Sequence, residues 1–323
     1  MAKNYPLTEN SDQMNGGWIY RDLIRNDDAG KCVIDFYTHR YQHSSRDEWL
    51  ERINSGRIFI DGTRTNCHTL IRCGQELSYH RPPWAEPATP RSFVVVYEDE
   101  DVVAVAKPSG LQVLPGGCFL ENTLLRLMRF CFGKAIAPAH RLGRGTSGII
   151  LFARTVRAKR WLSIEFQAGR IQKTYCALIV GHPSKDMFSV ETPIGPIPYP
   201  PLGQVFAARS DGKKALSKIC VIERRNEKIP ISLVNVTIPT GRPHQIRIHL
   251  AAAGFPLQGE PFFTHGGLPR PVDSNKRPPL PGDCGYCLHA MKISFRHPRL
   301  GCRVSLYCQP PKSFNRACST PTV

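Results

Sequence analysis

Runs of β-branched and other apolar residues, broken by short polar stretches, predict most of the strands in this chain of 323 residues. The clearest case is FVVVYEDEDVVAVAK at residues 93–107, where two apolar runs flank a charged turn and predict a strand, a turn and a strand. Further strands are predicted at GIILFART, KTYCALIVG, ALSKICVIER and ISLVNVTIP, and helices at residues 121–132 and at AKRWLSIEFQAG. This irregular mixture predicts an α+β domain around a mixed, mostly antiparallel sheet.

The pattern differs over residues 32–79. There VIDFYTHRY predicts an extended segment, DEWLERINSG predicts a helix and RIFIDG predicts a strand. Gly56 suits the end of the helix, and Asp61-Gly62 is a hairpin turn signal. Residues 1–30 are polar and weakly periodic, so we expect a flexible leader.

Proline-rich stretches suggest where the chain divides. HRPPWAEPATPRS separates the two patterns and predicts a semi-rigid linker, whereas the proline-rich stretch at residues 266–283 predicts a surface loop. The predicted organisation is a leader at 1–30, a small module at 31–82, a linker at 83–92, a main domain at 93–312 and a tail at 313–323.

The charge of the chain favours a polyanionic partner. Lys and Arg number 43 against 26 Asp and Glu, which gives a formal net charge of +17. A surface of this sign attracts nucleic acid through counterion release, with an acidic membrane surface as the competing partner. Because no apolar run approaches the ~18 residues needed to span a bilayer, we expect a soluble protein of the cytoplasm or, alternatively, the nucleus, with no membrane partner.

Cysteine chemistry offers one alternative. The chain has 12 cysteines but no signal segment, so we expect reduced thiols rather than a disulfide scaffold. A zinc site is conceivable, but the downstream pair lies in GCRVSLYC, which predicts a strand, and we therefore expect no metal. The residues of that alternative are Cys284, Cys287, His289, Cys302 and Cys308.

AHRLGRGTSGIILFART at residues 139–155 resembles the signature loop of the RluA class of RNA pseudouridine synthases. Four further blocks follow the order of that class: AKPSGLQVLPGG, KTYCALIVG, PTGRPHQIRIHLAAAGFPLQG and LHAMKISFRHP. The segment at 31–82 similarly resembles a small S4-like (α-L) RNA-binding module. The resemblance implies the pseudouridine synthase fold, isomerisation of uridine in tRNA or rRNA without a cofactor, and action as a monomer.

The resemblance also implies roles for particular residues. Tyr175 would stack under a uracil flipped out of the RNA, which answers the need to hold a detached base. In the class, a carboxylate after His-Arg-Leu acts as nucleophile and is held ionised by an arginine that matches Arg247. Basic residues expected to contact RNA are Arg141, Arg144, Lys173, Arg242 and His244, and, in the small module, Arg46 and Arg57 together with Arg52 and Arg64.

At the position of that carboxylate the sequence has Gly143. Glycine supplies no nucleophile, and we expect Arg247 to lack its partner, a situation that typically costs ~3–5 kcal/mol in a buried pair. Substitute carboxylates are Glu121, Asp211 and Glu260, the last at a position where the class usually has a structural aspartate. Two hypotheses follow: an active synthase, or a catalytically inactive RNA-binding relative.

Overall fold

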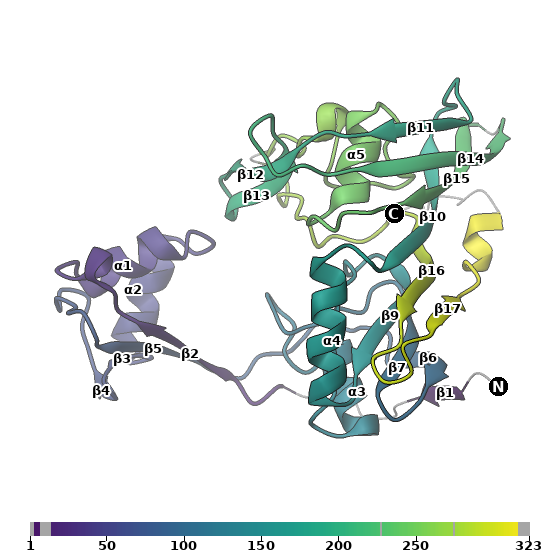
Figure 1. Cartoon of the computed structure of the whole chain (residues 1–323). Helices are drawn as coiled ribbons and strands as arrows, with labels where there is room; N and C mark the ends of the chain where they lie inside the picture. Colours follow the sequence, from purple (N-terminus) through teal and green to yellow (C-terminus); the bar gives the residue numbers. More distant parts are fainter. Residues whose placement is uncertain (1–2, 7–13, 227, 274, 316–323) are drawn as a thin grey trace. The chain divides into compact units, whose positions relative to one another are not determined.

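The computed structural model describes residues 3–6, 14–226, 228–273 and 275–315. The chain forms two compact units, labelled by element in Figure 1. Unit 1 comprises residues 1–9, 87–196 and 206–323, and unit 2 comprises residues 10–86 with 197–205. Each unit is described separately below.

Unit 1 is built on an eleven-stranded sheet, counted over the described residues. All its described strand pairs are antiparallel except β9 with β16, which confirms the expected mixed, mostly antiparallel sheet. The main path runs, in spatial order, through β1 (Lys3–Pro6), β6 (Ser92–Glu98), β7 (Val102–Lys107), β9 (Ser147–Ala153), β16 (Leu288–Arg296), β10 (Gln172–Val180), β15 (Ile231–Thr237), β14 (Ser217–Arg225) and β11 (Met187–Val190). Two strands pair at its sides, β17 (Arg303–Tyr307) and β8 (Ala137–Pro138). A separate hairpin consists of β12 (Ile194–Tyr199) and β13 (Gly203–Ala208), of which residues 197–205 are assigned to unit 2.

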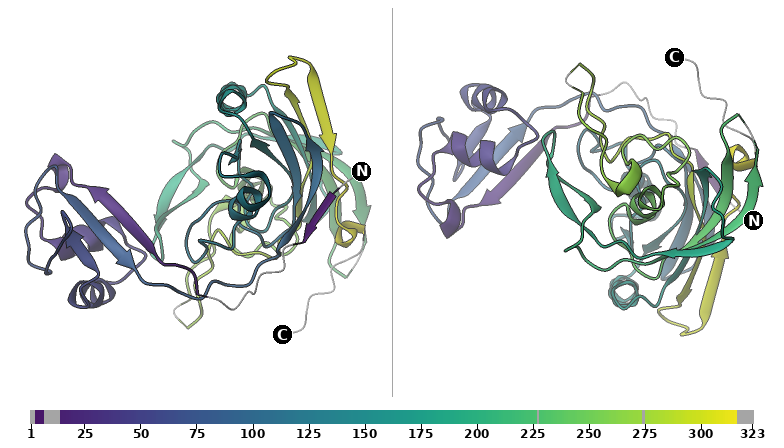
Figure 2. Two further views of the ribbon diagram at one scale, coloured as in Figure 1. Left: turned by 90° about the horizontal axis from the view of Figure 1, so that it is seen from below. Right: turned by 90° about the horizontal axis from the view of Figure 1, so that it is seen from above.

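Helices cover both faces of this sheet (Figure 2). α3 (Leu124–Phe132) and α5 (Gln245–Ala252) contribute to one large apolar core, together with alternate residues of β7, β9, β10 and β15. α4 (Val156–Gln167) packs on the opposite face, where Ala158 and Leu162 meet Ile149 and Leu151 of β9. Short 3-10 turns lie at His265–Gly267 (η2) and Lys312–Asn315 (η3).

The parallel pair of β9 and β16 depends on Gly148. Its φ is +107°, and an added Cβ would lie 2.3 Å from the carbonyl oxygen of Ala290, so no larger residue fits without moving the backbone. This close approach explains the glycine of Thr146-Ser147-Gly148 and brings the loop before β9 next to the residues that precede β16.

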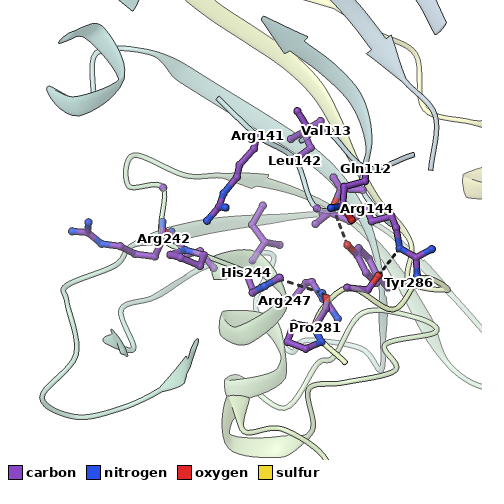
Figure 3. A pocket seen from close by; sticks show the side chains of 18 of the residues that line it. Gln112, Val113, Arg141, Leu142, Arg144, Arg242, His244, Arg247, Pro281 and Tyr286 are labelled. Carbon is purple, nitrogen blue, oxygen red and sulfur yellow. Dashed lines mark hydrogen bonds between the residues drawn. The ribbon is translucent and has the colours of Figure 1, made fainter. Parts of the chain in front are cut away.

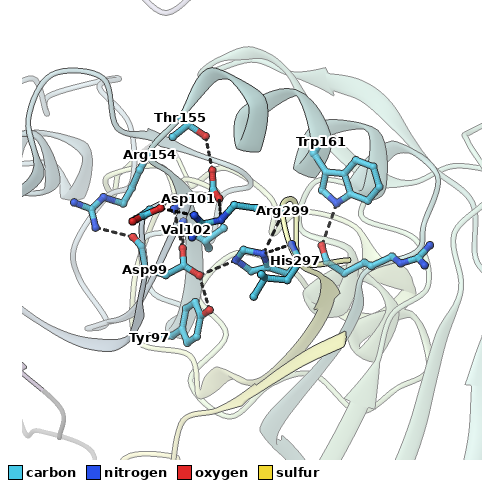
Figure 4. A network of polar contacts seen from close by, with 12 residues as sticks. Tyr97, Asp99, Asp101, Val102, Arg154, Thr155, Trp161, His297 and Arg299 are labelled. Carbon is cyan, nitrogen blue, oxygen red and sulfur yellow. Dashed lines mark hydrogen bonds and ion pairs between the residues drawn. The ribbon is translucent and has the colours of Figure 1, made fainter. Parts of the chain in front are cut away.

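A polar network lies at the C-terminal end of β9, at Ala153 and far from the loop just described (Figure 4). Asp99 accepts hydrogen bonds from the Tyr97 hydroxyl at 2.5 Å and from His297 Nε2 at 2.7 Å, as well as from two backbone amides. Asp101 is paired with Arg157 and Arg299. We call these residues the Asp99 network.

Unit 2 packs two helices on a four-stranded sheet. Its strands, in spatial order, are β2 (Trp18–Leu23), β5 (Glu76–Arg81), β3 (Ile58–Ile60) and β4 (Thr63–Arg64); a 3-10 turn, η1, spans Asn26–Asp28, and the helices are α1 (Val33–Arg40) and α2 (Arg46–Asn54). Ser45 and Glu48 form a capping box at the start of α2, and Gly56, with φ +68°, follows its end as expected. The hairpin turn at Asp61-Gly62, with φ of +49° and +80°, is likewise confirmed.

Two predictions for this region are wrong. Residues 18–23 of the expected flexible leader form β2, which pairs with β5, and Ile24 belongs to the core of unit 2. The expected extended VIDFYTHRY is instead α1, whose side chains at 33, 34, 36 and 37 are buried with helical spacing. Tertiary burial therefore overrides the strand preference of Val33 and Ile34. Residues 1–2, 7–13 and 316–323 of the leader and tail lie outside the described residues.

Within the described part of the chain, no helix is long and apolar enough to cross a membrane.

Candidate functional site

A cavity of about 520 Å³ opens on unit 1 between loops that are distant in sequence. Figure 3 shows side chains of Arg141, Arg242, Arg247 and Tyr286 arranged around it. Its wall is formed by residues 112–116, 141–144 with Thr146, and 241–247, and by Tyr175, Ile238, Pro281, Gly282, Tyr286 and Leu288. We call this cavity the base pocket. It joins residues of all five sequence blocks, and its charged lining residues, among those described, are all arginines.

Tyr175 lies on β10 and lines the base pocket. The register between β10 and β16 shifts between Thr174 and Tyr175, and a bulge of this kind re-aims a side chain. The ring is 8% exposed, and burial raises the pKa of the hydroxyl to about 12. Tyr175 therefore presents a neutral aromatic surface to the pocket.

The loop from Arg141 to Thr146 is held from behind by the AKPSG block. The buried Lys107 donates hydrogen bonds to the carbonyl oxygens of Leu111 at 2.7 Å and Arg144 at 3.1 Å. The hydroxyl of Ser109 donates to the Gly145 carbonyl at 2.7 Å. Burial lowers the pKa of Lys107 to about 7. The backbone carbonyl oxygens accept the hydrogen bonds of its amino group. The block therefore acts as a rigid support for the loop.

Arg247 is not left without a partner, which corrects the expectation drawn from Gly143. Its Nε donates to Glu260 Oε2 at 2.8 Å and its Nη2 donates to Oε1 at 2.6 Å. The two side chains are 3% and 1% exposed. Nη1 donates to the Pro281 carbonyl at 2.5 Å. A glutamate is one methylene longer than an aspartate, and here it provides the bidentate geometry that a buried arginine needs.

Tyr286 fills the space beside Gly143. An added Cβ on Gly143 would lie 2.9 Å from the Tyr286 hydroxyl oxygen, and one on Gly145 would lie 2.8 Å from the ring. The hydroxyls of Tyr286 and Thr146 are 3.2 Å apart, and the Arg247 guanidinium carbon lies 4.2 Å from the ring centre. The absence of side chains at Gly143 and Gly145 thus leaves the space that the Tyr286 ring fills, and Tyr286 is only 5% exposed.

The segment before α5 carries strained backbone. His244 has φ +55° and ψ +18°, a left-handed conformation that costs a non-glycine residue ~1–3 kcal/mol and concentrates at functional sites. Burial, with Arg247 and Arg141 nearby, lowers the pKa of His244 to about 3, so the ring is neutral. Gln245 fixes the turn by accepting from the Arg242 amide at 3.0 Å.

The structure places most of the proposed site residues together. Those that line the base pocket are Gly143, Tyr175, Arg247, Arg141, Arg144, Arg242 and His244. Lys173 does not line it, although its Nζ would lie 3.4 Å from a Cβ on the lining residue Gly241. Arg46 and Arg57 belong to unit 2. Their contacts with RNA stay predictions.

The substitute carboxylates are engaged elsewhere. Glu121 pairs with Arg126 at 2.6 Å, Asp211 pairs with Arg209, and neither lines the base pocket. Glu260 lies behind Arg247, and its Oε1 also accepts from the amides of Phe262 and Phe263. None of the three has an oxygen facing the pocket.

The zinc alternative finds no support in the described residues, which contain no group of three or more potential ligands. His289 is instead held by Ser147 Oγ at 2.8 Å and by the Cys308 carbonyl at 3.1 Å.

Sequence reasoning missed Tyr286, Gly145 and Lys107. Two glycines flanking an arginine in LGRGTS were the available signal for a large side chain packed against this loop. Nothing in the sequence indicated that this side chain would be Tyr286, which lies 140 positions beyond Thr146.

Comparison with known proteins finds relatives of one family. A family model described as RNA pseudouridylate synthase matches residues 101–252. RNA pseudouridine synthase 5 of Arabidopsis thaliana is 40% identical, over 87% of this chain and 89% of that protein. An uncharacterized RNA pseudouridine synthase of Synechocystis is 42% identical, over 82% of this chain and 89% of that protein. The solved structure of human RNA pseudouridylate synthase domain containing 1 has a TM-score of 0.53 at 24% identity, over 70% of this chain and 86% of that chain, which shows a shared fold.

Proposed function

Because the chain belongs to the RNA pseudouridine synthase family, we propose that it isomerises uridine to pseudouridine in a tRNA or rRNA, with the base pocket as the site of reaction. A Saccharomyces cerevisiae relative is named tRNA pseudouridine(32) synthase, mitochondrial, and a Xanthomonas campestris relative is named ribosomal large subunit pseudouridine synthase D. These names support the two substrate classes.

One observation carries the proposal: a buried aromatic ring and several arginines line the same cavity. Flipping a uridine out of stacked RNA costs a few kcal/mol. Stacking on Tyr175 returns ~1–3 kcal/mol, and the arginines at the rim are placed to contact the phosphates on either side. The pocket is therefore suited to an extruded nucleotide.

Purified chain incubated with total RNA from cells that lack this protein tests the proposal. Mass spectrometry should find pseudouridine at discrete uridines that were unmodified before incubation. Tyr175→Ala should lower the rate about tenfold or more through lost stacking, whereas Tyr175→Phe should retain most of it. Absence of any converted uridine with the wild-type chain would contradict the proposal.

A second candidate function is RNA binding without chemistry. It is favoured by the absence of any Asp or Glu among the described residues that line the base pocket. In this case wild-type protein would bind the RNA with the salt dependence of phosphate contacts and leave every uridine unchanged. The incubation above separates the two functions.

Further parts of the proposal concern organisation and setting. The small module at 31–82 would add phosphate contacts through Arg46 and Arg57, with the main domain at 93–312 carrying the reaction. We propose a monomer of the cytoplasm or nucleus that requires no cofactor.

A further inference from the structure

The base pocket offers few side chains that can attack carbon. Splitting the bond between uracil and ribose by covalent catalysis requires a nucleophilic side chain. Among the described residues that line the pocket, those with a hydroxyl or imidazole are Thr146, Tyr175, His244 and Tyr286. No lining residue is Asp, Glu, Cys, Ser or Lys.

Three of these four are poorly placed or too weak. The Thr146 hydroxyl is an alcohol, far less acidic than a phenol, and no base contacts it. Tyr175 is needed as the stacking surface, and burial raises the pKa of its hydroxyl with no cation among the described residues to oppose the rise. His244 directs Nδ1 toward Arg247 Nη1 at 3.4 Å. Burial, with Arg247 and Arg141 nearby, lowers the pKa of its ring and makes it a weak base.

Tyr286 alone combines a phenol with a fixed cation. The Arg247 guanidinium carbon lies 4.2 Å from its ring centre and would stabilise a phenolate. Glu260 holds that arginine in place. Because Gly143 and Gly145 have no side chains, Tyr286 fits beside them. Its hydroxyl oxygen lies 2.9 Å from the position that a Cβ on residue 143 would take. The phenol oxygen therefore lies where the sequence lacks the expected carboxylate.

We propose that Tyr286 is the catalytic nucleophile of this chain, an inference that rests on the proposed function. Tyrosine forms covalent intermediates in other enzymes, including glycosidases that cleave a comparable bond.

The chemistry balances without a co-reactant. The phenol loses its proton to solvent, and the phenolate oxygen attacks ribose C1′ while the C1′–N1 bond breaks and its electron pair leaves on uracil N1. The uracil anion then turns within the pocket, and C5 attacks C1′, returning the oxygen–C1′ pair to the phenolate. C5 finally loses its proton to solvent and N1 gains one, which completes the isomerisation.

A phenol nucleophile imposes a pH signature. Burial raises the pKa of Tyr286, although Arg247 opposes the rise, so the phenol is mostly protonated at neutral pH. The reactive phenolate therefore increases about tenfold per pH unit below the pKa. An enzyme that uses a carboxylate would already be fully ionised above pH 6.

The test measures single-turnover rates from pH 6.5 to 9.5 for the wild type, Tyr286→Phe and the control Tyr307→Phe, whose ring is 58% exposed on β17. We expect a wild-type rate that rises close to tenfold per unit, no change in the control, and a loss of ~10³-fold or more in Tyr286→Phe, with RNA affinity retained. Rapid acid quench of the wild type should also yield a ribose-linked peptide that contains Tyr286.

The outcomes are distinguishable. A wild type that converts uridine with a rate independent of pH, or a folded Tyr286→Phe with more than a tenth of wild-type activity, overturns this inference and leaves the proposed function standing. A wild type that converts no uridine at any pH overturns both. If Tyr286→Phe fails to fold, the wild-type pH profile and the quenched adduct decide, and absence of both overturns the inference.

Discussion

The two ends of β9 differ in how the charged side chains around them are paired. At the far end, the carboxylates of the Asp99 network find their hydrogen-bond and ion-pair partners within the protein (Figure 4). At the near end, several arginines line the base pocket, and the carboxylate paired with Arg247, that of Glu260, does not line the pocket and has both oxygens engaged. The comparison teaches that the Asp99 network serves the fold, whereas the base pocket keeps positive charge for a ligand.

The largest effect should come from breaking the buried pair under the pocket. Glu260→Gln removes the charge that neutralises Arg247 and should lower the free energy of unfolding by ~3–5 kcal/mol, measured by urea denaturation. Glu121→Gln removes an exposed pair with Arg126 and should cost under ~1 kcal/mol. Equal losses in the two variants would show that Glu260 has no special role.

A smaller effect should reveal the fit between the glycines and Tyr286. Gly143→Ala should cost ~1–3 kcal/mol because its Cβ meets the phenol oxygen at 2.9 Å. In a Tyr286→Phe background that cost should largely vanish, since no ring carbon lies within 4 Å of this Cβ. Gly145→Ala, whose Cβ meets the ring itself, should stay costly in both backgrounds. Additive effects at position 143 in a double-mutant cycle would refute this packing.

The Asp99 network should contribute to acid stability. Burial opposes ionisation of Asp99, but hydrogen bonds from Tyr97, two backbone amides and His297 outweigh it and hold the pKa below 3.8. Because the folded pKa is depressed, the contribution is present above the unfolded pKa and is lost as pH falls through the folded value. Asp99→Asn should therefore cost ~1–2 kcal/mol at pH 7 and less at pH 3. A difference that grows toward low pH would contradict this assignment.

The smallest effect should separate ligand charge from structural charge. Arg141→Gln should weaken RNA binding by ~1 kcal/mol and reduce the salt dependence by about one phosphate contact, without loss of stability. Arg154→Gln loses hydrogen bonds to Glu98 and to the Asp99 carbonyl. It should lower the stability of the fold and leave RNA affinity and its salt dependence unchanged. Titration of RNA at several salt concentrations, together with melting curves, checks both variants.

Sequence reasoning identified the parts of the molecule that depend on local pattern. The strand pair at residues 93–107, the helix after Thr123 and the hairpin at Asp61-Gly62 all follow from spacing and turn chemistry. β2 was missed because its pairing with β5 involves residues far along the chain.

The site shows the same division. The ordered blocks pointed to Tyr175 and Arg247, but the partner of Arg247 and the side chain beside Gly143 depend on how distant loops meet. Glu260 was recognised only as standing where the class usually has a structural aspartate, and Tyr286 had no local signal at all. The pairing of Glu260 with Arg247 and the place of the Tyr286 phenol are properties of packing.

The most direct test of the central claim uses RNA labelled with tritium at uracil C5. Isomerisation replaces the C5–H bond by a bond to ribose, so each turnover releases one tritium to water. We predict that the wild-type chain releases more than one tritium per protein molecule from tRNA or rRNA. RNA binding without tritium release would contradict the claim that the base pocket carries out this reaction.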